Sequence, residues 1–236
     1  SIGNFIAKKL ADKLKTLKED ESQFYADIWD SISPFIKIGA MEDEKFAEQV
    51  KEIILYSTTK NTSADNEDNN ELIKSGSKTF TTLDAYKNRL TDENKKVLYS
   101  TDEVSQSTAL NMWTSQGKEV LKLDTVIDTQ FIPWLEEKNK EINFVRVDSE
   151  LDESIKDDSP EIADKDGNTK SETLKKMISS ALNNEKVTVQ VQSLKGENSP
   201  PSLILLPEQM RRINDITALM EQKLPGLPEY HNLIVN

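Results

Sequence analysis

The N-terminal part of the chain carries three helical patterns of apolar residues. In residues 1–18 apolar side chains recur every three or four positions, as on one helix face: Ile2, Phe5, Ile6, Leu10, Leu14 and Leu17. A second stripe consists of Phe24, Ile28, Ile32 and Phe35, with Tyr25 and Trp29 beside it. Asp20 is placed to cap this second helix, and Pro34 and Gly39 to end it. With a third stripe in "MEDEKFAEQVKEIIL", residues 1–54 are predicted to be helical.

The next section, residues 55–153, alternates between strand and helix patterns. After a first strand at 54–58, three apolar runs predict further strands, at residues 96–100, 119–123 and 142–147. Those three runs are about 23 residues apart, which leaves room for a crossover helix each time, so their strands are expected to be parallel. The helices are expected at 103–116 and 128–138. This pattern predicts a small three-layer α/β domain with a parallel sheet.

Two polar stretches interrupt these patterns. Residues 59–79 contain little to bury and are expected to form a mobile loop before a short helix capped by Thr81. The acidic residues 154–170 are interpreted as a linker. Beyond it, residues 171–236 show a helix, two strands, an amphipathic helix and a terminal strand, which predicts a small α+β unit.

Composition narrows the classes of function. The chain has 42 acidic and 30 basic residues and a net charge of −12, so a nucleic-acid partner is not expected. It contains no cysteine, which excludes thiolate chemistry and fits the reducing cytoplasm. A single histidine, His231, cannot build a histidine-rich metal site. No apolar run approaches the roughly 18 residues of a membrane span, so no membrane partner is expected.

Three carboxylates are candidates for an acidic site. Asp102, Asp124 and Asp128 follow the ends of predicted parallel strands, where α/β folds usually bind ligands. Converging there, they could hold magnesium or accept a phosphoryl group; alternatively, they cap helices. The loop "DKDGNTKSE" fails the calcium-loop pattern because Ile162 and Thr173 occupy ligand positions. No catalytic residue, cofactor site or metal site is therefore predicted within the chain.

Two amphipathic helices carry apolar residues that either pack in the chain's own core or remain partly exposed. In "IDTQFIPWLEEKN", Gln130, Pro133 and Trp134 cannot all face inward together with Phe131. In "PEQMRRINDITALM", one face is formed by Met210, Ile213, Ile216 and Met220. Methionine is an adaptable contact residue as well as a core filler, so both helices are candidates for a binding surface.

Several long stretches together resemble the heat-shock protein 90 chaperone family in its bacterial form. They are "FYADIWDSISPFIKIGAMEDEKFAEQV", "FTTLDAY", "GKEVLKLDTVIDTQFIPWLE", "FVRVDSELDE" and "PEQMRRINDITALM", in family order over nearly the whole chain. The resemblance implies that residues 1–153 are the later part of the family's middle domain. It implies that residues 171–236 are the first part of the C-terminal domain, without the dimerisation helices.

The resemblance also implies a function. The whole protein would be an ATP-dependent folding chaperone and stress protein, a cytoplasmic homodimer that uses ATP and magnesium. The ATP domain would lie outside this chain, so this segment is expected to be a non-enzymatic monomer that binds partly folded clients and couples domains. By resemblance, the client contacts are Gln130, Phe131, Trp134, Met210, Ile213, Ile216 and Met220. The alternatives are a non-catalytic interaction scaffold, or a switch domain with an acidic site at Asp102, Asp124 and Asp128.

Overall fold

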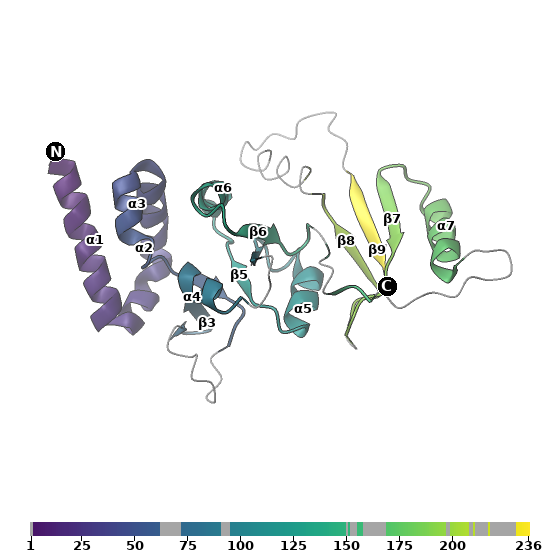
Figure 1. Cartoon of the computed structure of the whole chain (residues 1–236), viewed down its shortest axis with the longest axis horizontal. Helices are drawn as coiled ribbons and strands as arrows, with labels where there is room; N and C mark the ends of the chain where they lie inside the picture. The colour runs from purple at the N-terminus through teal and green to yellow at the C-terminus, as the bar shows by residue number, and fades with distance from the viewer. Residues whose placement is uncertain are drawn as a thin grey trace. The chain divides into compact units, whose positions relative to one another are not determined.

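Figure 1 shows the helices and strands of the computed structural model. The chain divides into two compact units, which are described separately. The structure describes residues 2–61, 72–90, 95–149, 151, 155–157, 169–196, 199–207, 210, 217 and 230–236. The first unit contains residues 1–103 and 119–145, and the second contains 104–118 and 146–236. The division falls before residue 146, whereas the sequence pattern places a boundary after residue 153. Most of the expected linker lies outside the described residues.

Three helices begin the first unit, as predicted. They are α1 (Ile2–Asp20), α2 (Ser22–Glu42) and α3 (Glu44–Val50), and each contacts the other two. Asp43 caps α3, because its carboxylate accepts hydrogen bonds from the backbone N–H groups of Lys45 (2.8 Å) and Phe46 (3.1 Å). The cap expected at Asp20 is wrong: α2 begins after Glu21, which makes no side-chain cap.

Helix α2 buries a different face from the one predicted. Its buried residues are Tyr25, Ala26, Trp29, Ser33, Ile36, Lys37 and Ala40. Phe35, predicted to face the core, is 75% exposed, and Phe24 is also exposed. The observed face buries two large aromatic rings, and the Tyr25 hydroxyl donates to the buried carbonyl of Ile53 (3.0 Å). This burial raises the pKa of Tyr25.

Neither Pro34 nor Gly39 ends α2, contrary to the sequence prediction. The helix continues through Pro34, which has no N–H to donate to the carbonyl of Asp30. It also continues through Gly39, where the absence of a side chain lets the ring of Phe46 pack against the backbone. A Cβ at position 39 would lie 2.9 Å from Cε1 of that ring. The close packing of α3 against α2 therefore leaves no room for a side chain at position 39.

Replacing Gly39 with alanine is expected to lower the free energy of unfolding by about 1 kcal/mol, although alanine is the better helix former by roughly that amount. The reason is overpacking against the buried Phe46 ring, which typically costs about 1–3 kcal/mol. Urea unfolding followed by circular dichroism measures the change. The same substitution in a Phe46→Leu background is the control and should be favourable there. A Gly39→Ala variant more stable than the parent would contradict the contact.

A six-stranded mixed sheet completes the first unit. Its strands, in spatial order, are β2 (Ile73–Ser75), β3 (Lys78–Thr81), β1 (Tyr56–Thr58), β5 (Val120–Lys122), β4 (Lys96–Ser100) and β6 (Asn143–Arg146). Strands β4 and β5 are parallel, as predicted. Strand β1 is antiparallel to β3 and β5, and β2 and β3 form an antiparallel hairpin. The sheet is therefore mixed, not wholly parallel.

The β2–β3 hairpin occupies the end of the stretch expected to be a loop. Gly76 forms its turn with φ +57°, a conformation that favours glycine. Residues 62–71 of that stretch lie outside the described residues. The hairpin contacts α2 through polar groups: Gln23 donates to the carbonyl of Lys74 (2.6 Å), and the Ser75 hydroxyl donates to Asp27 (2.6 Å).

Three further helices alternate with strands β3 to β6. They are α4 (Leu83–Asn88), α5 (Ser107–Ser115) and α6 (Asp128–Lys138), the last with the predicted bounds. Thr82, not Thr81, caps α4 by accepting from the N–H of Ala85 (3.2 Å). Within the described residues, no helix is long and apolar enough to cross a membrane.

The second unit contains the predicted α+β elements. They are α7 (Lys170–Leu182), β7 (Val187–Val191), β8 (Ser202–Leu205) and β9 (His231–Val235). The three strands are ordered β7-β9-β8, with β7 and β9 parallel and β8 and β9 antiparallel. Thr169 and Glu172 form a capping box at the start of α7. The mixed α/β and α+β fold class expected from the sequence is confirmed.

Candidate functional site

Helix α6 presents a small exposed face, which we call the α6 face and define as Gln130, Pro133 and Trp134. Gln130 and Pro133 are exposed, and Trp134 is partly buried. Residues 130 and 134 are four positions apart, so they lie on the same side of the helix. The prediction that these residues cannot all face inward is confirmed. The α6 face thus combines an aromatic ring with two exposed neighbours.

Phe131 is not part of this surface. Its side chain is 0% exposed and belongs to the main hydrophobic core, so the assignment of Phe131 as a client contact is wrong. Its ring stacks on that of Trp134, with centroids 5.1 Å apart and an interplanar angle of 18°. The buried Phe131 ring therefore packs against the inner side of the Trp134 ring. A stripe with Phe131 and Trp134 three residues apart predicts a shared helix side, but it does not distinguish the inner ring from the outer one.

A buried ion pair lies at the start of α6. Lys37 of α2 donates to Asp128 at a distance of 2.5 Å, and the two residues are 4% and 1% exposed. The other oxygen of Asp128 accepts from the backbone N–H (3.1 Å) and the hydroxyl (2.7 Å) of Thr125. The Lys37 ammonium also lies 5.5 Å from the centre of the Phe131 ring. The sequence pattern does not indicate a role for Lys37, because its partner is 91 residues away.

The same ion pair lines a cleft of about 530 Å³ in the first unit. Its lining includes two further ion pairs, Lys78–Asp30 (2.5 Å) and Lys122–Glu103 (2.9 Å). Tyr56 also lines it, and burial, together with the nearby Asp128 carboxylate, raises the pKa of Tyr56. The three lysines of the cleft are thus each paired with a carboxylate.

The three candidate carboxylates do not form a common acidic site. Asp128 is buried and forms an ion pair with Lys37, whereas Asp124 and Asp102 are exposed. Among the residues that the structure describes, no group of three or more acidic, histidine or cysteine side chains is placed to hold a metal ion. Asp128 does not cap α6 either. It is the first residue of the helix, and its carboxylate accepts a hydrogen bond from the backbone N–H of Thr125 in the preceding turn.

The second candidate helix is largely outside the described residues. Met210 is helical and partly buried. Ile213, Ile216 and Met220 lie outside the described part of the chain, so their roles remain predictions. Met210 belongs to the second unit and α6 to the first.

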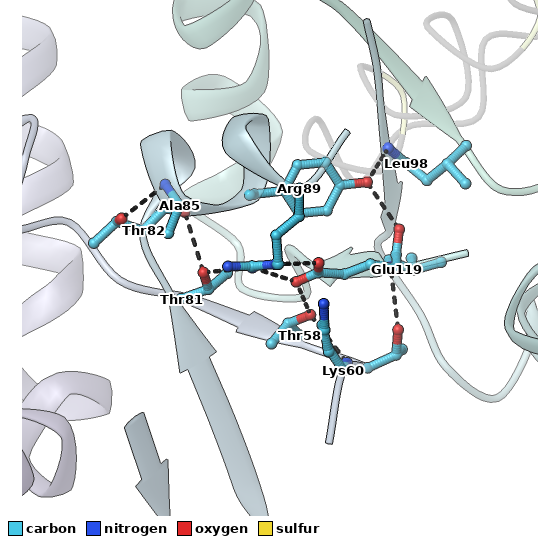
Figure 2. A network of polar contacts seen from close by, with 11 residues as sticks. Thr58, Lys60, Thr81, Thr82, Ala85, Arg89, Leu98 and Glu119 are labelled. Carbon is cyan, nitrogen blue, oxygen red and sulfur yellow. Dashed lines mark hydrogen bonds and ion pairs between the residues drawn. The ribbon is translucent and has the colours of Figure 1, made fainter. Parts of the chain in front are cut away.

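A polar network that sequence analysis missed joins the ends of several elements in the first unit (Figure 2). Arg89 donates to both oxygens of Glu119 (3.0 and 2.9 Å) and to the Thr81 hydroxyl (2.8 Å). Glu119 also accepts from the Thr58 hydroxyl (2.7 Å), and its carbonyl accepts from Tyr86 (2.8 Å). Thr58, Thr81 and Tyr86 lie in β1, β3 and α4, whereas Arg89 directly follows α4 and Glu119 directly precedes β5. The network therefore joins elements of the fold.

Comparisons with known proteins identify relatives. The family model described as Hsp90 protein matches residues 1–225. A protein of Porphyromonas gingivalis named chaperone protein HtpG is 29% identical over 252 residues, covering 100% of this chain and 33% of the relative. One of the same name from Bacteroides thetaiotaomicron is 26% identical over 250 residues, covering 100% and 34%.

One solved structure is also similar to part of the chain. The middle domain of a Plasmodium falciparum heat-shock protein matches 63% of this chain and 57% of its own, with 20% identity and a TM-score of 0.47. The chain spans about a third of the length of the curated relatives. Because the family model matches nearly its whole length, the chain belongs to the Hsp90 family.

Proposed function

We propose that this chain is the client-binding and domain-coupling segment of an ATP-dependent folding chaperone. Membership of the Hsp90 family supports this, as do relatives named as chaperones. In this proposal residues 1–153 are the later part of the middle domain and residues 171–236 begin the C-terminal domain. The ATP and magnesium site and the contacts of a cytoplasmic homodimer belong to the other two thirds of the protein. The segment itself then neither binds nor hydrolyses ATP.

The observation that carries the client-binding proposal is the α6 face. Partly folded proteins expose apolar side chains, and an aromatic ring held at a surface offers them a large contact at little cost in side-chain entropy. Trp134 has this character, because the buried Phe131 ring stacks beneath it. Exposed Gln130 and Pro133 add a polar and an apolar neighbour.

Trp134→Ala is expected to weaken the binding of an unfolded protein by about 5–30-fold, equivalent to about 1–2 kcal/mol of lost contact. The probe is a fluorescently labelled model protein that has been reduced and carboxymethylated, and the readout is its anisotropy. Val126→Ala is the matched control, because Val126 is a 79% exposed apolar residue just before α6 but outside the α6 face. Unchanged affinity in a Trp134→Ala variant with a native circular dichroism spectrum would remove α6 from the client site.

A further inference from the structure

We propose that Lys37 and Asp128 are positioning residues that hold the α6 face in the orientation that contacts clients. This inference rests on the proposed function, since it concerns the same face. Neither residue contacts a client: both are buried, at 4% and 1% exposure. Lys37 lies in α2 and Asp128 is the first residue of α6, so their 2.5 Å contact joins two elements of the first unit.

The two carboxylate oxygens of Asp128 connect the start of α6 to two different parts of the structure. One carboxylate oxygen accepts from the ammonium of Lys37, and the other accepts two hydrogen bonds from Thr125 in the preceding turn. A charged pair that is this deeply buried needs such close partners, and few other arrangements satisfy it. The pair therefore favours the position of the α6 N-terminus in which both oxygens of Asp128 have their partners.

The pair also acts on the residues beneath the α6 face. The Lys37 ammonium lies 5.5 Å from the centre of the Phe131 ring, and that ring stacks on Trp134. A continuous set of contacts thus runs from Lys37 of α2 through Phe131 to the partly buried Trp134 of the α6 face. The backbone of α6 has a weak point in the same region, because Pro133 cannot donate a helical hydrogen bond to the carbonyl of Thr129. The first turn of α6 consequently depends more on Asp128.

The other end of α6 provides a comparison within the same unit. Lys138 donates to Glu44 of α3 at 2.7 Å, which raises the pKa of Lys138 and lowers that of Glu44. This pair is largely exposed, so water and salt replace it readily. Both ends of α6 thus carry a lysine–carboxylate pair with the helical section, but only the pair at Asp128 is buried.

Hydrogen exchange of the intact chain, combined with client binding, tests this positioning role. The double variant Lys37→Met, Asp128→Asn leaves no unpaired buried charge and retains an acceptor for Thr125. We expect its circular dichroism to be native, its α6 amides to exchange at least tenfold faster, and its affinity for the reduced, carboxymethylated protein to fall at least fivefold. Lys138→Met removes the exposed pair and should change neither quantity more than twofold.

The outcomes separate this inference from the proposed function. Unchanged exchange in α6 of the double variant overturns the positioning role, whatever happens to client binding. Faster exchange with unchanged client affinity also overturns it, provided that Trp134→Ala does weaken binding. If Trp134→Ala leaves binding intact, the proposed client site fails, and the exchange comparison alone still decides whether the pair holds α6. If Lys138→Met changed amide exchange and client affinity as much as the double variant does, burial of the pair would be irrelevant, and this would contradict the inference.

Discussion

Replacing Trp29 with alanine is expected to lower the free energy of unfolding by about 3–5 kcal/mol, the usual cost of removing a buried Trp. Trp29 is 2% exposed and lies beside Tyr25 on the buried face of α2, with ring centroids 5.6 Å apart. It also lines the cleft, so water can fill part of the space that the indole leaves. The loss should therefore fall toward the lower end of that range.

The matched control is Phe35→Ala in the same helix. Phe35 is mostly exposed, and its removal is expected to change the free energy of unfolding by less than about 0.5 kcal/mol. Urea unfolding followed by far-ultraviolet circular dichroism measures both variants. A larger loss from Phe35→Ala than from Trp29→Ala would mean that α2 buries the stripe first suggested by its sequence.

Arg89→Met is expected to cost about 3–5 kcal/mol, because it leaves the Glu119 carboxylate charged and poorly solvated. Both side chains are largely buried, and Arg89 donates two hydrogen bonds to Glu119 (Figure 2). The Thr81 hydroxyl loses a donor in the same variant. The effect should extend to the sheet, because these groups join the ends of β1, β3 and β5.

A double-mutant cycle isolates the interaction between the two residues. Glu119→Gln removes the negative charge, and the variant with both substitutions has no unpaired ion. Its loss of stability in urea should be smaller than the sum of the two single losses by about 1–3 kcal/mol. Strictly additive losses would indicate that Arg89 and Glu119 contribute independently, and the network would not act as a unit.

Helix α2 shows what periodicity can predict. Its existence follows from the spacing of apolar residues, but two stripes, through Phe24 and Tyr25, lie side by side on the helix. Periodicity alone does not determine which of the two stripes is buried. Tertiary contacts decide between them: Tyr25 reaches the carbonyl of Ile53, and Lys37 reaches Asp128. Both partners are distant in sequence, so local patterns carry no information about them.

The pairing of the strands is also predictable from the sequence only in part. The spacing of apolar runs correctly predicts that β4 and β5 are parallel, since a helix must connect them. The apolar pattern does not predict the β2–β3 hairpin, because its strands are short and polar, although Ser75-Gly76 is a recognised turn signal. At the candidate site, α6 has its predicted bounds and Trp134 is partly buried, but the burial of Phe131 required the three-dimensional structure.

The assignment of α5 to the second unit has a consequence for synthesis of the chain on the ribosome. Residues 104–118 belong to a unit whose remaining sequence begins only at residue 146. Trp113 donates to the carbonyl of Val147 (2.9 Å), and Gln116 donates to that of Lys195 (3.2 Å). At about 5–20 residues per second, α5 leaves the ribosome several seconds before Lys195. Trp113, which is buried in the folded protein, cannot donate to the carbonyl of Val147 until that residue has been made, so α5 cannot complete its contacts when it is first synthesised.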